Sequence, residues 1–93
     1  MGTFRRPKPE RLAEKLIQIR VTLALSQNEL IRHLGLAEEL TQSEISAYER
    51  GVREPPLHVL LKYARKAGIC LDVLVDDGID LPTRLPSKPK HNI

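Results

Sequence analysis

Few side chains of this sequence have the type and spacing that catalysis or metal binding would need. Cys70 is the only cysteine, and His33, His58 and His91 share no ligand-like spacing with it or with each other. The sequence has no nucleophile–base pair, no phosphate-cradling glycine loop and no paired carboxylates. A chain of 93 residues also leaves little room for a deep pocket. We therefore expect no enzyme, no metal site and no cofactor, and we interpret Cys70 as a small, partly buried thiol.

Two short motifs carry the chemistry of helix initiation instead. Ser26–Glu29 (S-Q-N-E) and Thr41–Glu44 (T-Q-S-E) both have the form S/T-x-x-E. In this motif the hydroxyl accepts a hydrogen bond from the glutamate amide, and the glutamate side chain reaches back to the amide of the capping residue. Gly35 and Gly51 are natural ends for the two helices. Two short capped helices in succession predict a helix-turn-helix over residues 26–51.

Three further helices must position this pair. Apolar residues recur at helical spacing between residues 10 and 24 and predict a first helix there. The Pro55-Pro56 pair suits the first turn of a fourth helix that ends at Gly68, and a short fifth helix ends near Asp77-Gly78. Leu71, Leu74 and Val75 indicate the fifth helix, and the residues that we expect to be buried in the first four helices are Leu12, Leu16, Ile19, Leu23, Leu30, Ile31, Leu34, Ile45, Tyr48, Leu57, Leu60, Leu61 and Ala64. Five helices without a strand pattern predict an all-α fold.

The positive charge of the chain lies at its two ends. The net charge is +3, yet residues 12–79 contain eight basic and ten acidic residues and carry a net charge of −2. We interpret residues 1–9 as a flexible basic arm, residues 10–78 as the domain, and residues 79–93 as a disordered Pro/Lys-rich tail. No apolar run approaches the ~20 residues of a membrane span, so we expect a soluble cytoplasmic protein.

The central part of the sequence resembles the Cro/C1-type (XRE) family of helix-turn-helix transcriptional regulators, which have lambda-repressor-like DNA-binding domains. The resemblance covers residues 11–77, and its elements follow the order of the family. The matching segments are Leu25–Leu30 (L-S-Q-N-E-L), Leu34-Gly35, Ile45–Gly51 (I-S-A-Y-E-R-G), Pro56-Leu57 and Leu60–Ala64 (L-L-K-Y-A). The resemblance implies a five-helix bundle that inserts the helix over residues 41–50 in the major groove of double-stranded DNA.

The resemblance also implies roles for individual residues. Gln27 corresponds to a glutamine that touches phosphate and braces the recognition helix, and Arg20 and Glu49 match a charged pair that ties the first helix to the third. The residues that it places against DNA from the recognition helix and the following loop are Thr41, Gln42, Ser43, Ser46, Arg50 and Arg53, with Ala47 on the same exposed turn as Ser46. The chemistry agrees, because a glutamine amide can bond adenine N6 and N7 together and arginine adds charge beside phosphates.

Each of these roles has a structural alternative. Gln42 and Ser43 are also typical solvent-facing residues of a first helical turn, and we favour DNA contact for both. For Thr41 we favour the capping role over base reading. Arg50 and Arg53 could be an ordinary solvated pair, but their loop follows the recognition helix, which favours phosphate contact.

The connection between the two helices departs from the family pattern. Residues 36–40 lengthen the turn or extend the second helix. Ile31 stands where the family usually has a small residue, and we expect the longer turn to move the recognition helix outward and make room for it. Glu38, Glu39 and Glu44 place acid near the surface that would meet phosphates, which opposes binding within a Debye length of ~8 Å. DNA affinity would then depend on the basic arm or on dimerisation.

These observations predict a sequence-specific transcriptional regulator, in the first place a repressor, that binds DNA as a homodimer. Its recognition helices would lie ~34 Å apart, one turn of DNA. The apolar residues that could form the dimer contact are Ile69, Leu71, Val73 and Val75. The alternative is a protein-interaction module, such as an antitoxin or an adaptor with a protein partner, which the net negative centre of the chain favours. Copurification of a partner, without binding to random duplexes, would distinguish this alternative.

Overall fold

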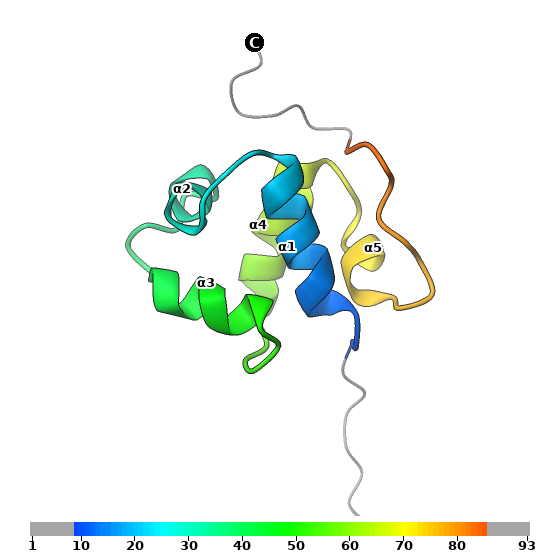
Figure 1. Ribbon diagram of the computed structural model, residues 1–93, viewed down its shortest axis with the longest axis horizontal. Coiled ribbons are helices and arrows are strands. Elements are labelled where there is room, and N and C mark those ends of the chain that lie inside the picture. Colours follow the sequence, from blue (N-terminus) through cyan, green and yellow to red (C-terminus); the bar gives the residue numbers. More distant parts are fainter. Residues whose placement is uncertain (1–8, 86–93) are drawn as a thin grey trace, which may run out of the picture.

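The computed structural model describes residues 9–85, and this part of the chain forms five helices and no strand (Figure 1). They are α1 (Leu12–Thr22), α2 (Gln27–His33), α3 (Gln42–Glu49), α4 (Leu57–Ala67) and α5 (Leu71–Val75). The predicted all-α class is confirmed. The first and fifth helices are shorter than predicted. The basic arm up to residue 8 and the tail from residue 86 lie outside the described residues.

Side-chain caps begin α2 and α3 as the two sequence motifs predict. Ser26 Oγ accepts from the Glu29 amide at 3.1 Å, and Glu29 Oε1 accepts from the Ser26 amide at 2.9 Å. Thr41 Oγ1 accepts from the Glu44 amide at 3.3 Å, and Glu44 Oε1 accepts from the Thr41 amide at 2.9 Å. Both boxes are reciprocal, so each satisfies two amides that the first turn of a helix would leave without a partner.

The chain leaves its first three helices through residues in the left-handed region. Gly35 has φ +73° and Gly51 has φ +74°, conformations that glycine adopts without a Cβ clash. After α1 the same place is taken by Ala24, with φ +63°, where a Cβ is unfavourable. The ends of α2 and α3 are therefore encoded by glycine, whereas the end of α1 places an exposed alanine in the left-handed region, between the buried residues Leu23 and Leu25.

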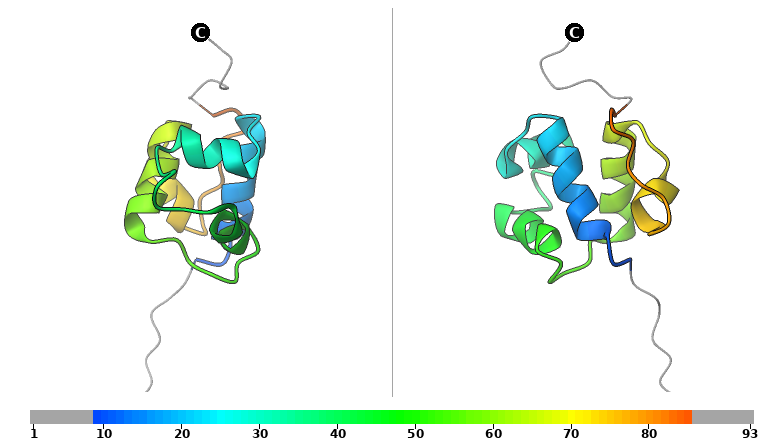
Figure 2. Two further views of the ribbon diagram at one scale, coloured as in Figure 1. Left: turned by 90° about the vertical axis from the view of Figure 1, so that its left-hand side faces the viewer. Right: turned by 45° about the vertical axis from the view of Figure 1, so that its right-hand side comes forward.

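Helix α1 runs through the centre of the molecule, with α4 behind it, the α2–α3 pair on one side and α5 on the other (Figures 1 and 2). The residues that we expected to be buried in the first three helices are all in the core. The expectation is wrong for Leu57, which is 68% exposed, and for Leu61, which is partly exposed. Helix α4 instead buries Val59, Leu60, Tyr63, Ala64 and Ala67. Successive residues are rotated by ~100° on a helix, so this stripe carries residues 57 and 61 out of the core.

The extra residues between α2 and α3 form a turn with two apolar anchors and do not extend α2. Leu36 and Leu40 are 4% and 8% exposed, and the Leu40 amide donates to the Leu36 carbonyl at 2.9 Å. Ile31 is 5% exposed, so this large residue lies in the core. The acidic residues Glu38 and Glu39 stay exposed between the two anchors.

A buried lysine joins α1 to the end of α5. Lys15 is 1% exposed, and its ammonium donates to three backbone carbonyls, those of Val73 at 2.8 Å, Asp76 at 3.0 Å and Ile79 at 2.7 Å. Each N–H of the ammonium thus has an acceptor, which offsets the cost of burying the charge. The lysine fixes the chain as it leaves α5.

The side chain of Asp77 caps the start of α1 from the other end of the domain. Its Oδ2 and Oδ1 accept from the amides of Glu10 at 2.9 Å and Arg11 at 3.0 Å. These hydrogen bonds, first from Glu10 and then from Arg11, lower the pKa of the Asp77 carboxyl. The first helix therefore begins without a local cap, because its cap comes from a residue 66 positions away.

Two expectations for the last part of the chain are wrong. Leu81 and Leu85, each 9% exposed, pack in the core, so the described residues beyond position 78 belong to the packed domain and not to a disordered tail. Cys70 precedes α5 at the N-cap position, but its side chain is exposed and makes no capping hydrogen bond. Among residues 9–85, no helix is long and apolar enough to cross a membrane.

Candidate nucleic-acid interface

A polar hollow of about 320 Å³ opens where the first turns of α2 and α3 meet. Its lining consists of Gln27, Gln42, Ser43, Ser46 and Arg50, and all five were singled out from the sequence. The lining contains one cation, four neutral hydrogen-bonding side chains and no carboxylate. The start of the second helix and the exposed face of the third thus meet at one concave surface.

A chain of hydrogen bonds behind this hollow connects α1, α2 and α3. Arg20 donates from Nε to Glu49 Oε2 at 2.7 Å and from Nη2 to Glu49 Oε1 at 3.1 Å. Gln27 Nε2 also donates to Glu49 Oε1, at 3.0 Å, and Gln42 Nε2 donates to Gln27 Oε1 at 3.2 Å. Glu49 is therefore the common acceptor that fixes the guanidinium of Arg20 and the amide of Gln27 at once.

The ion pair at the base of this chain is shielded from solvent. The side chains of Arg20 and Glu49 are 19% and 6% exposed, and Arg20 Nη1 also donates to the Leu25 carbonyl at 3.0 Å. The hydrogen bonds to Glu49 raise the pKa of Arg20, so the guanidinium stays charged. A charge-assisted, two-point contact of this kind holds one geometry, and it fixes α3 against α1.

The same chain determines which atoms Gln42 presents outward. A carboxylate only accepts, so Gln27 must turn its NH₂ group toward Glu49 and its Oε1 toward Gln42. Gln42 must then donate one N–H inward to Gln27. Its Oε1 and its second N–H remain for a ligand. An acceptor beside a donor is the pattern that complements adenine N6 and N7 in the major groove.

The remaining residues of the hollow lie along α3. Ser43 is exposed in the first turn, and Ser46 is partly exposed one turn later. Arg50 Nε donates to Ser46 Oγ at 3.2 Å, which draws the guanidinium back along the helix toward the hollow. Ala47 is also partly exposed.

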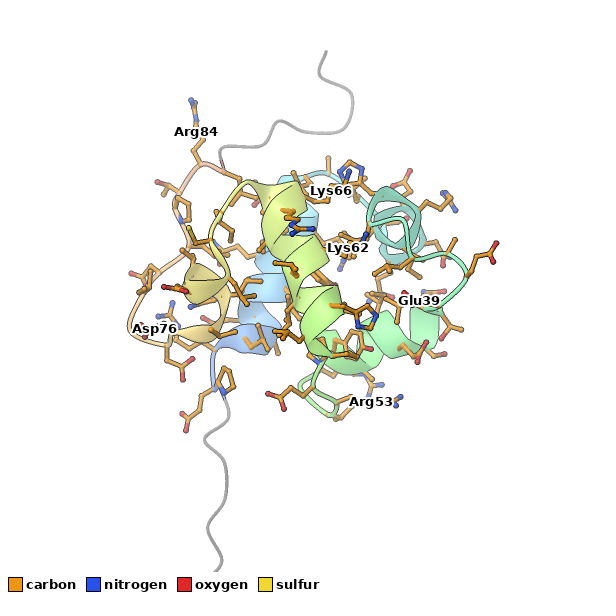
Figure 3. The ribbon with its side chains drawn as sticks, turned by 180° about the vertical axis from the view of Figure 1, so that it is seen from behind. Glu39, Arg53, Lys62, Lys66, Asp76 and Arg84 are labelled. Atoms are coloured by element: carbon orange, nitrogen blue, oxygen red, sulfur yellow. The ribbon has the colours of Figure 1, made fainter. Side chains whose placement is uncertain are left out.

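Two of the expected contact residues do not line this hollow. The hydroxyl of Thr41 is engaged in its capping box. Arg53 lines a second hollow, of about 350 Å³, together with Glu39, Glu44 and Glu54. Figure 3, which shows the molecule from behind, has Arg53 and Glu39 on this side. Thr41 therefore acts as a cap, and Arg53 is separated from the surface that contains Gln42.

Of the two acids of the long turn, Glu39 faces this second hollow. Glu39 Oε1 lies 3.5 Å from His58 Nε2 at the start of α4, and both side chains are more than half exposed. Glu39 is thus directed away from Gln42, which weakens our expectation that the turn repels phosphates. Within residues 9–85, no group of three His, Cys, Asp or Glu side chains is placed to hold a metal ion.

Comparison with known proteins identifies this architecture. A helix-turn-helix family model matches residues 16–74, from within α1 to within α5. Comparisons with curated proteins and with solved structures gave no match. Because the family match covers more than half of the chain, the chain belongs to the helix-turn-helix family, in its Cro/C1-type (XRE) branch. Proteins of this family are DNA-binding regulators.

Proposed function

We propose that this protein regulates transcription by inserting α3 in the major groove of a specific duplex, where Gln42 reads an adenine. The observation that carries the proposal is the orientation of Gln42. Its amide is fixed through Gln27, Glu49 and Arg20, and the acceptor–donor pair left outward complements adenine. A side chain that is already oriented loses less conformational entropy when it binds.

The dimensions and charge of the surface support this proposal. An α-helix such as α3 is about 10–12 Å across with its side chains, which fits the ~12 Å width of the major groove. Ser43 and Ser46 can bond base edges or phosphates beside Gln42, and Arg50 adds charge without reading sequence. Arg53, outside the hollow, is free to contact phosphate farther along the backbone.

We further propose that the protein acts in the cytoplasm as a homodimer and represses transcription by occupying its site. The apolar residues around α5 support a dimer contact, since Ile69, Leu71 and Val73 are only partly buried and Val75 and Ile79 are 36% and 37% exposed. A two-fold dimer would read a palindromic site. Sedimentation of the free protein and of its DNA complex tests this part.

The test of base reading is Gln42→Ala. It should weaken binding to the selected duplex by ~1–3 kcal/mol and relax the preference at one base pair. Gln18→Ala, which truncates an exposed glutamine on α1 that does not line the hollow, is the matched control and should leave the affinity unchanged. An unchanged affinity of Gln42→Ala, with an unchanged melting temperature, would show that Gln42 does not read a base.

A further inference from the structure

Several cations in the centre of the chain lie on a different part of the surface from the candidate DNA interface. Residues 12–79 contain eight basic residues. Lys15 and Arg20 are engaged inside the domain, and Arg50 and Arg53 lie on or after α3. The remaining four are Arg32, at the end of α2, and Lys62, Arg65 and Lys66, on α4. Half of the central cations therefore lie away from the candidate DNA interface.

Three of these cations surround a concave surface. A hollow of about 440 Å³ lies between the end of α2 and the second half of α4. Its cationic wall is Lys62, Arg65 and Lys66, and its other side is His33, Leu34 and Gly35. Leu34 is 2% exposed and forms an apolar floor, and the space above Gly35 is open, with no atom within 4 Å of where a Cβ would stand. Figure 3 shows Lys62 and Lys66 side by side on α4, toward α2.

This basic hollow is separate from the surface that contains Gln42. Gln27, the first residue of α2, lines the polar hollow, and His33, the last residue of α2, lines the basic one. Since α2 has 7 residues and is ~10 Å long, the two surfaces lie at its opposite ends. The two hollows share no lining residue.

The cations of the basic hollow are not neutralised within residues 9–85. None of Lys62, Arg65 and Lys66 forms an ion pair with another described residue. Lys62 and Lys66 are four positions apart on one helix, an arrangement that is unfavourable for like charges. Burial and then the Lys66 ammonium lower the pKa of His33, on the other side of the hollow. Helix-dipole preference accounts for cations in the last turn of α4, but not for Lys62 in its middle.

We propose that the basic hollow binds an acidic segment of a partner protein, in which one apolar side chain lies between carboxylates. The carboxylates would pair with Lys62, Arg65 and Lys66, and the apolar side chain would cover Leu34 above Gly35. A duplex fits this surface less well, because phosphates offer no apolar group for the floor. The proposal does not depend on DNA binding, and it gives this regulator a surface through which a second protein can act while DNA is bound.

The first test is selection of random dodecapeptides displayed on phage against the 93-residue chain. Counter-selection uses the Lys62→Glu/Lys66→Glu variant, whose changes lie outside the core. The expected result is enrichment of peptides with several Asp or Glu residues around one apolar residue. No enrichment, or enrichment of neutral or basic peptides, would overturn the proposal.

The second test measures the enriched peptide by fluorescence anisotropy. Lys66→Glu should weaken its binding at least about tenfold, and the ring signals of His33 should shift when the peptide binds to the wild type. Arg84→Glu changes the net charge equally at an exposed residue that Figure 3 shows away from the hollow, and it should change binding less than about twofold. Equal losses in the two variants, or a random duplex that displaces the peptide from wild type and shifts the same His33 signals, would contradict a protein-binding hollow.

Discussion

Replacing Glu49 by glutamine should destabilise the domain because it leaves a shielded guanidinium without its counter-charge. Glu49 is 6% exposed at its side chain and receives two hydrogen bonds from Arg20 and one from Gln27. Removal of one partner of a buried ion pair costs about 3–5 kcal/mol. In this variant the side chain of Arg20, which is 19% exposed, still donates to the Leu25 carbonyl. The amide oxygen of the new glutamine can still accept one hydrogen bond. These residual contacts reduce the expected loss to about 2–3 kcal/mol.

The assay is urea denaturation followed by circular dichroism, together with thermal melting. For a domain of this size the loss corresponds to a decrease of roughly 10–20 °C in Tm. The matched control is Glu14→Gln, which removes an ion pair whose acid is 63% exposed, and it should cost less than about 0.5 kcal/mol. The double variant Arg20→Met/Glu49→Leu should recover much of the loss, because it buries no unpaired charge. An effect of Glu49→Gln as small as that of Glu14→Gln would refute this reasoning.

Three further predictions follow from the same contacts. Lys15→Met leaves three backbone carbonyls without their ammonium donor and should cost about 2–4 kcal/mol in urea denaturation; no loss would mean that water replaces the ammonium. Ala24→Gly relieves a left-handed alanine and should stabilise by about 0.5–1 kcal/mol, where a loss would show that the conformation is not strained. Asp77 has a lowered pKa because it accepts from the Glu10 and Arg11 amides, so its stabilising contribution is present above its ordinary pKa and is lost as the pH falls below about 4. In Asp77→Asn this part of the acid dependence of Tm should disappear, and an unchanged profile would exclude the cap.

Local sequence signals were sufficient for the helix-turn-helix. The S/T-x-x-E motifs at Ser26 and Thr41 correctly predicted both helix starts, because each cap involves only residues three positions apart. Gly35 and Gly51 correctly predicted where the two helices end. The residues around the polar hollow came from the family resemblance, and the structure places Gln27 and Gln42 in direct contact.

Long-range contacts could not be predicted in the same way. The carbonyl ligands of Lys15 lie 58 to 64 positions away, and a lysine in an amphipathic pattern is normally assigned to solvent. Leu81 and Leu85 lie in a proline-rich, polar segment whose composition is typical of disorder, yet both side chains pack on the core. In α4 the buried face includes Tyr63, Ala64 and Ala67, whereas the more apolar Leu57 is exposed. Apolar character alone therefore did not indicate which face of the helix is buried.

The sequence contains the cationic wall of the basic hollow, but not the hollow itself. Lys62 and Lys66 belong to α4, whereas His33 and Leu34 belong to the end of α2, and only the packing of the two helices brings them together. Three of the eight central cations line it, and they lie within residues 62–66, in a stretch (residues 55–71) without an acidic residue, although residues 12–79 as a whole carry a net charge of −2. The net charge of the whole region therefore concealed a local cluster of cations, and the packing of α2 against α4 makes this cluster one wall of a hollow.

Selection from a random duplex library, at a stated salt concentration and with wild type and Gln42→Ala in parallel, tests DNA reading most directly. We expect wild type to enrich one site with an adenine that the variant no longer prefers, while the other positions of the site are unchanged. Since the orientation of Gln42 depends on Gln27, Gln27→Ala should weaken the preference for adenine at the same base pair. No enriched sequence with wild type, or the same base preferences in all three proteins, would contradict the account.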